Sequence, residues 1–391
     1  MEQTEVLHEL HRRALWTGGW HILGLLTISA CLLRTWPAEV VLQWLLQAFV
    51  VLSYVHFQLF SNLGQNHPPT TRELRPSLGV ANGITLARGL GASCLAGFFM
   101  LPSKSLLSGA SWIQWTPGLL YLSIGCADFV DGFWARHTLT ESVLGQRLDV
   151  EIDAMGLLAA SALAVRMNRL PLFYLMVGAS YYLYKLGIRY RYKRGRIVLP
   201  LKDRIQARIA AGLNMGFVGV ALLPVFAEKV LSPAACFFAM PLIAGFAWDW
   251  LVVSARLTDD AAHRMQKILD LAVGIAPLLV RLALLVWGPA VTWTIYKSLP
   301  AATALAVLCL WTMMVLGWLG RTAALIAACW LTHAASPGNA PQVLILALSA
   351  SLVLLILGSG LWSWWKPEDV LLSRKAGSIP CTRRSGPIST K

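Results

Sequence analysis

The sequence DFVDGFWAR occupies residues 128–136, and GQRLDVEID follows at residues 145–153. Together they hold four aspartates, Asp128, Asp131, Asp149 and Asp153, in a chain that is 57% hydrophobic and only 13% charged. Acidic side chains in or beside membrane-spanning helices are energetically costly, and those that occur usually serve a function. This four-aspartate motif therefore indicates both the fold and the activity of the protein.

The composition of the 391 residues is that of a membrane protein. A helix needs about 20 apolar residues to cross a bilayer, and runs of nearly that length recur along the whole chain. We predict an all-α integral membrane protein with about twelve spans. The predicted regions are an N-terminal two-span region (1–62), a six-span domain (72–260), a C-terminal four-span region (268–366) and a disordered tail (367–391).

The net charge of +14 is explained better by membrane topology than by nucleic-acid binding. Lys and Arg residues of membrane proteins concentrate in cytoplasmic loops. With both termini in the cytoplasm, only six of the 33 fall outside, namely Arg34, Lys104, Arg166, Arg169, Lys229 and Lys297. The same topology places all four aspartates near the cytoplasmic surface. The compact loops favour a prokaryotic inner membrane, and we expect no nucleic-acid partner.

The spacing of the aspartates predicts a metal site. Asp128 and Asp131 are three residues apart, and Asp149 and Asp153 are four apart, so each pair shares one face of a helix. Two antiparallel helices can direct the pairs at each other, and the carboxylates would then repel unless cations lay between them. Mg²⁺ or Mn²⁺ fits such oxygen ligands. Two such ions about 4 Å apart suit the displacement of a phosphoryl group.

Three further residues of the motif are suited to a phosphate ligand. Gly132 and Gly145 leave space beside the acids, where a ligand can approach the backbone. Arg136 offers a planar, permanently charged group that matches phosphate oxygens. The combination predicts a diphosphate held by two metal ions.

The motif resembles the signature of the CDP-alcohol phosphotransferases (phosphatidyltransferases) at every fixed position. A second match is Asn82-Gly-Ile-Thr85-Leu-Ala-Arg88, which is similar to the N-x-x-T-x-x-R of that family. Ala81 departs from the proline found in many members, which should affect the entry to the helix more than the chemistry. The resemblance covers residues 72–260.

This resemblance implies a bundle of six transmembrane helices around a polar cavity open to the cytoplasm, and a possible homodimer. It implies transfer of a substituted phosphate from a CDP-alcohol to an acceptor hydroxyl, with release of CMP. Asp128, Asp131 and Asp149 would hold two metal ions, while Asp153 would face the metals and act as the catalytic base. The cytidine diphosphate would be held by Asn82, Thr85, Gly132, Ala135, Gly145 and Arg136.

The basic segment from Lys185 to Arg208 has two interpretations. It can fix the topology and contact anionic lipid headgroups. It can instead bind a phosphate on the acceptor, for which Lys202 and Arg208 are the candidates. At the C-terminal end, Gly317-Trp-Leu-Gly-Arg321 and Leu357-Gly-Ser-Gly-Leu-Trp-Ser363 faintly resemble the DoxX-like membrane family, which implies no particular activity.

We predict a metal-dependent phosphotransferase of phospholipid biosynthesis. CDP-diacylglycerol is the favoured donor because the site opens at the membrane face. One alternative is a soluble CDP-alcohol donor with a lipid acceptor. Another is a divalent-cation transporter that uses the acids for selectivity. Gly132, Ala135 and Arg136 argue against the transporter, because a cation pathway is hindered by a fixed arginine beside its carboxylates.

Overall fold

The computed structural model describes residues 3–101, 111–138, 141–199, 205–226, 228–257, 259–296, 301–334 and 342–365. These residues fold into helices joined by short connections, and no strand occurs among them apart from an isolated bridge between Trp318 and Trp365. The helices are α1 (Gln3–Leu32), α2 (Ala38–Asn62), η1 (Leu63–Gln65), α3 (Gly79–Ala96), α5 (Ser111–Thr138), α6 (Val143–Arg166), η2 (Leu172–Tyr174), α7 (Leu175–Lys193), α8 (Ile205–Ala221), α9 (Glu228–Val253), α10 (Asp259–Tyr296), α11 (Ala301–Leu316), α12 (Gly320–Ala334) and α13 (Gln342–Leu357).

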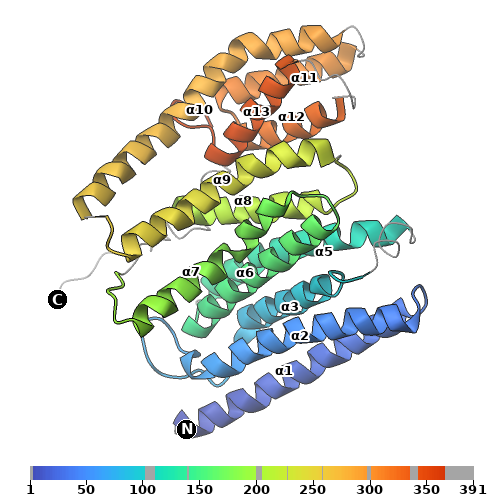
Figure 1. Ribbon diagram of the computed structural model, residues 1–391, viewed down its shortest axis with the longest axis vertical. Coiled ribbons are helices and arrows are strands. Elements are labelled where there is room, and N and C mark those ends of the chain that lie inside the picture. The colour runs from blue at the N-terminus through green and yellow to red at the C-terminus, as the bar shows by residue number, and fades with distance from the viewer. Residues whose placement is uncertain are drawn as a thin grey trace, which may run out of the picture. The chain divides into compact units, whose positions relative to one another are not determined.

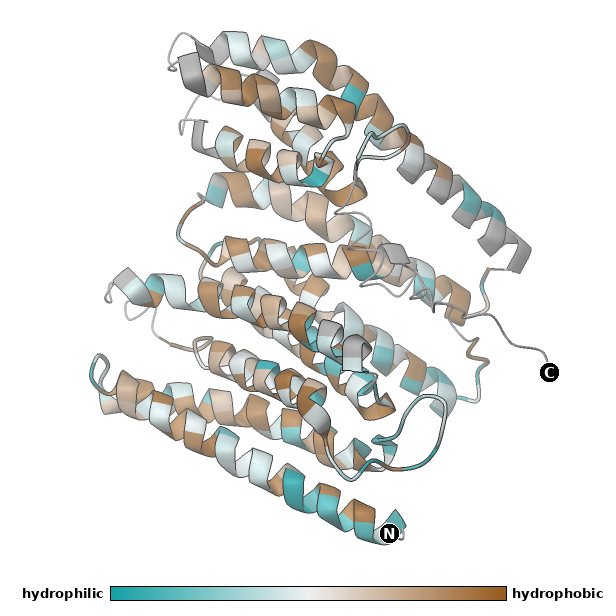
Figure 2. Ribbon diagram, turned by 180° about the vertical axis from the view of Figure 1, so that it is seen from behind, coloured by the Kyte–Doolittle hydropathy of each residue, from teal (hydrophilic) through white to brown (hydrophobic). Residues whose placement is uncertain are grey.

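The apolar character of these helices confirms a membrane protein. Three helical segments, Gln3–Leu32, Ala38–Gln65 and Val230–Val253, are long and apolar enough to cross a bilayer. Shorter apolar helices occur in α8 and in α10 to α13. Hydrophobic residues occupy most of the middle parts of the helices, and hydrophilic residues are found more often at helix ends and connections (Figure 2). The all-helical prediction is confirmed, whereas the twelve spans, the six-helix bundle and the predicted domain boundaries stay predictions.

The chain divides into two compact units. The first unit comprises Met1–Tyr190 and Asn214–Ala235, and the second comprises Arg191–Leu213 and Cys236–Lys391. In the first unit, α2 lies between α1 and α3, and α3 packs against both α5 and α6 (Figure 1). The helices that carry the four-aspartate motif and the upstream Asn82–Arg88 motif therefore belong to one unit.

The periodicity of α1 and α2 explains why they pair. The buried side chains of α2 recur every three or four residues, which places them on one stripe of the helix. These side chains are Val41, Trp44, Ala48, Leu52, Val55 and Leu59. Large apolar side chains on the other faces, such as Trp20 and Leu23 of α1 and Phe57 of α2, are exposed. An exposed apolar face of this kind suits contact with lipid chains.

Close helix contacts bring α2 onto α3. A Cβ atom at Gly97 would lie 2.6 Å from Nε1 of Trp44, and one at Gly89 would lie 2.9 Å from Cγ1 of Val55. Such distances are shorter than real Cβ contacts, so a side chain at either position would force the facing side chains or α2 itself to shift. The lack of side chains therefore sets how closely α2 approaches the helix that carries Arg88.

The segment after α2 folds back onto the start of α6. The Asn66 side chain donates hydrogen bonds to the carbonyls of Arg75 and Ser77, at 3.0 and 2.8 Å. The backbone N–H of Val143 donates to the carbonyl of His67 at 3.0 Å. The first turn of α6, which precedes Asp149, is thus tied to this connecting segment.

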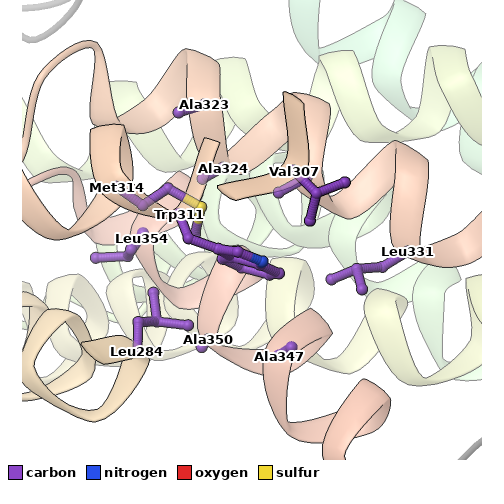
Figure 3. Packing of buried hydrophobic residues seen from close by; sticks show 11 residues of the cluster. Leu284, Val307, Trp311, Met314, Ala323, Ala324, Leu331, Ala347, Ala350 and Leu354 are labelled. Atoms are coloured by element: carbon purple, nitrogen blue, oxygen red, sulfur yellow. The ribbon is translucent and has the colours of Figure 1, made fainter. Parts of the chain in front are cut away.

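The second unit has its own apolar core. It is formed by residues of α10 to α13 around Trp311, including Leu284, Val307, Met314, Leu331 and Leu354 (Figure 3). Arg281, which the sequence places within an apolar run, is buried here. Its guanidinium donates hydrogen bonds to the carbonyls of Val315, Ser359, Leu361 and Trp362. These contacts give Arg281 a structural role, since they satisfy carbonyls at the end of α11 and in the segment that follows α13.

The packing of α7 on α6 generates a first prediction. A Cβ atom at Gly178 would lie 2.7 Å from the Leu158 Cα atom and 3.2 Å from the Leu157 carbonyl oxygen. Because backbone atoms cannot rotate away, Gly178→Ala should destabilise the protein by about 1–3 kcal/mol. The measurement is thermal unfolding in detergent. Gly216→Ala is the matched control, since its Cβ would meet nothing within 4 Å. Equal melting temperatures for the two variants would contradict this packing.

Candidate metal centre

The four motif aspartates converge on one arginine. Asp128 and Asp131 lie towards the end of α5, Asp149 and Asp153 lie in the first turns of α6, and Arg88 comes from α3. Nη1 of Arg88 is 2.7 Å from Oδ2 of Asp131 and 2.7 Å from Oδ1 of Asp149. Nη2 is 3.1 Å from Oδ1 of Asp128 and also forms an ion pair with Asp153. The structure thus brings together the two pairs of acids that the sequence predicts to face each other.

The site has a buried side and an accessible side. The Arg88 side chain is only 1% exposed, and Asp128 and Asp131 are buried. The side chains of Asp149 and Asp153 are 40% and 29% exposed. A ligand that reaches this cluster from outside would therefore meet the α6 acids first.

The charges of the cluster fit cation binding. Four carboxylates surround one guanidinium, so these five side chains together carry a formal charge of −3. Carboxylate oxygens of Asp128, Asp131 and Asp149 lie within 4.8 Å of one another. Hard divalent cations prefer such oxygen ligands. The residues present therefore match the donor set expected for Mg²⁺ or Mn²⁺.

The upstream motif supports this cluster through a second polar network. The Thr85 hydroxyl is 3.0 Å from Oδ2 of Asp131, and Nδ2 of Asn82 is 3.3 Å from Oγ of Ser142. Ser142 caps α6 by accepting a hydrogen bond from the backbone N–H of Gly145 at 3.0 Å. A side chain at Gly145 would collide with the Asn82 carboxamide. Residues from both sequence motifs thus meet at the start of α6.

Sequence reasoning missed two residues of this region. Ser142 was detectable, since a serine directly before a helical run is a typical N-cap. Glu151 lies off the helix face that the motif acids share, so the sequence predicts no role for it. In the structure, however, Glu151 is buried. It accepts hydrogen bonds from Tyr54 and Tyr181, which are 97 and 30 residues away in the chain. No local pattern could have identified these partners.

The remaining predicted residues are not brought to the cluster by described contacts. Gly132, Ala135 and Arg136 lie in α5, but the side chains of the latter two are outside the described residues. Lys202 is also outside them. Arg208 is exposed on α8, in the part of this helix that belongs to the second unit.

Comparison with known proteins finds one family model that matches this region. The model of the CDP-alcohol phosphatidyltransferase family matches residues 78–245. The match includes both sequence motifs and confirms the resemblance inferred from them. The family is one of transferases that move a phosphatidyl group from a CDP-alcohol. Comparisons with curated proteins and with solved structures gave no match.

The position of Arg88 predicts that its removal can be offset by metal. In Arg88→Met the four carboxylates lose the guanidinium that they share, which should cost about 3–5 kcal/mol of stability in chelator. A divalent cation should restore most of this loss, because it supplies the missing positive charge. Thermal unfolding in EDTA and in excess Mg²⁺ or Mn²⁺ measures both effects. Arg147→Met, at an exposed arginine of α6, is the control. Equal melting of both variants in EDTA would contradict the role of Arg88.

Proposed function

We propose that this chain is a metal-dependent CDP-alcohol phosphotransferase of the phosphatidyltransferase type. It transfers a substituted phosphate from CDP-diacylglycerol to the hydroxyl of an acceptor alcohol and releases CMP, as a step of phospholipid biosynthesis. The observation that carries this proposal is the convergence of four motif carboxylates from α5 and α6 at one cluster. The family match over residues 78–245 supports the class of reaction.

In this proposal Asp128, Asp131 and Asp149 hold two divalent cations, and Asp153 faces them. When bound, Mg²⁺ or Mn²⁺ would neutralise the diphosphate and stabilise negative charge on the reacting oxygens. Arg88 shares its single charge among the same acids, and Thr85 supports Asp131. These two residues therefore orient carboxylates that would otherwise repel each other.

Asp153 acts as the base on the acceptor. Its carboxylate takes the proton of the acceptor hydroxyl, whose oxygen then bonds to the phosphorus of the lipid phosphate. The bond from this phosphorus to the bridging oxygen breaks, and CMP leaves with that oxygen. The partial exposure of Asp153 supports this assignment, since the buried Asp128 and Asp131 are less accessible to an acceptor. A carboxylate is a weak base, so its effect depends on close positioning.

The donor nucleotide would lie along the glycine-containing face of the motif. Gly132 and Ala135 would leave room for it, Gly145 would let Asn82 lie against the start of α6 beside it, and Arg136 would supply a charged partner for its phosphates. Asn82 and Thr85 line the same region, where Asn82 approaches Gly145 closely. An acceptor that carries a phosphate would use Lys202 and Arg208.

Apolar residues beside the acids favour a lipid donor. Phe129 and Val130 lie between Asp128 and Asp131, and Val150 follows Asp149, and all three are half exposed. Successive helix positions point about 100° apart, so these side chains lie on other faces of α5 and α6 than the acids. Helices with acids on one face and exposed apolar side chains on another suit a substrate with a polar head and acyl chains, which supports CDP-diacylglycerol over a soluble donor.

The proposal predicts metal-dependent CMP release from CDP-diacylglycerol by the purified protein. The assay includes Mg²⁺ or Mn²⁺ and compares glycerol 3-phosphate, serine, inositol, inositol phosphate and no acceptor. Release that requires one acceptor and stops in EDTA is the expected result. Release from CDP-choline alone would instead indicate a soluble donor. No CMP from any donor would refute the enzyme assignment and leave cation transport to be tested in liposomes.

Asp153→Asn should lower turnover by about 10²–10⁴-fold, because the amide cannot accept the hydroxyl proton. Stabilisation by Mg²⁺ or Mn²⁺ should persist, since Asp128, Asp131 and Asp149 remain. CMP release and metal-dependent melting provide the two readouts. Glu73→Gln, at an exposed acid outside the helices, should behave like the wild type in both. Turnover of Asp153→Asn within a few-fold of that of the control would exclude Asp153 as the base.

A further inference from the structure

Glu151 forms a second buried polar cluster on the opposite side of α6. It lies two residues from both Asp149 and Asp153, which places it about 200° around the helix from either one. Its side chain is only 11% exposed. The hydroxyls of Tyr54 and Tyr181 each donate a 2.7 Å hydrogen bond to one of its oxygens, and Lys185 forms an ion pair with it.

The partners of Glu151 come from helices on either side of α6 in the chain. Tyr54 belongs to α2, and Tyr181 and Lys185 belong to α7. Helix α2 ends before residue 78, where the family match begins. The same helix packs against Gly89 through Val55, directly after Tyr54. Helix α2 therefore contacts both α6 and the part of α3 that carries Arg88.

The contacts at Glu151 restrict how α6 can move. Hydrogen bonds are directional, so two hydroxyls that bond different oxygens of one carboxylate fix its position and the rotation of its helix. Asp149 and Asp153 are on the same rigid helix and follow any rotation or sliding. A functional metal site needs its ligands within about 0.5 Å and 10–20° of the correct geometry. A small rotation of α6 would therefore disturb the ligands.

We propose that Glu151 and Tyr54 are positioning residues, which hold α6 in the orientation that directs Asp149 and Asp153 at the metal ions. Through Tyr54, helix α2 then contributes to the geometry of the metal site. This inference rests on the proposed function, because it assumes that the α6 acids bind metal.

The test compares two phenylalanine variants of the full-length protein. Tyr54→Phe removes one hydroxyl from Glu151, together with the contacts of this hydroxyl with Gln58 and Tyr182. Tyr174→Phe removes an equally short hydrogen bond, since the buried Tyr174 hydroxyl donates to Oδ1 of Asn214 at 2.6 Å, but it lies outside the Glu151 cluster. Both variants should melt at similar temperatures, which lie below that of the wild type. Only Tyr54→Phe should bind Mn²⁺ more weakly, which is measured as free Mn²⁺ by electron paramagnetic resonance.

The expected loss of Mn²⁺ affinity is about fivefold for Tyr54→Phe, the change that corresponds to one net hydrogen bond of roughly 1 kcal/mol. The value of kcat for Tyr54→Phe should fall together with its Mn²⁺ affinity. Tyr174→Phe should retain the wild-type Mn²⁺ affinity and kcat. Glu151→Ala should lose more affinity than Glu151→Gln, because the amide oxygen still accepts one of the two hydroxyls. This partial rescue would not follow from a general loss of stability.

Unchanged Mn²⁺ affinity in both Tyr54→Phe and Glu151→Ala would overturn the positioning role and leave the proposed function intact. An equal loss in Tyr54→Phe and Tyr174→Phe would also overturn it. Absence of CMP release from the wild type with every donor would overturn the proposed function alone, because the Mn²⁺ comparison needs no turnover. A wild type that binds no Mn²⁺ would refute both.

Discussion

The repulsion among four carboxylates is the constraint on which the first unit depends. Like charges at this distance in a partly buried site raise each other's energy unless positive charge lies between them. Arg88 supplies part of that charge from α3 and contacts all four acids, so α3 must pack closely against both α5 and α6. The arrangement of the three helices and the chemistry of the site therefore have one electrostatic cause.

The excess of negative charge distinguishes this cluster from a structural ion pair. A buried ion pair that served stability alone would be closer to neutral, since unpaired buried charges are costly. The four acids and Arg88 together carry a formal charge of −3, and Asp149 and Asp153 are the accessible members of this group. That imbalance is tolerable in a protein whose ligand brings positive charge. The charge of the cluster therefore favours metal binding independently of the motif.

Periodicity and spacing were sufficient to predict much of this structure. The all-helical structure of the described residues follows from the apolar periodicity, and the two pairs of aspartates meet as their intervals of three and four residues require. What the sequence could not show is the set of partners from distant helices. Tyr54 and Glu151 are 97 residues apart, and His21 and His56, which lie 3.1 Å apart between α1 and α2, carry no local signal. Such contacts follow from helix packing, which local patterns do not encode.

A common physical rule connects these unpredicted contacts. A polar group inside an apolar helix bundle has no water to bond, so it must find its partners in other helices. Arg281 meets this need with four carbonyls of the second unit, and Glu151 meets it with groups of α2 and α7. Each such group thereby fixes the helices around it more firmly than apolar contacts can, because hydrogen bonds depend on direction. Glu151 does so on the helix that carries Asp149 and Asp153, so a group outside the motif can control the geometry of the site.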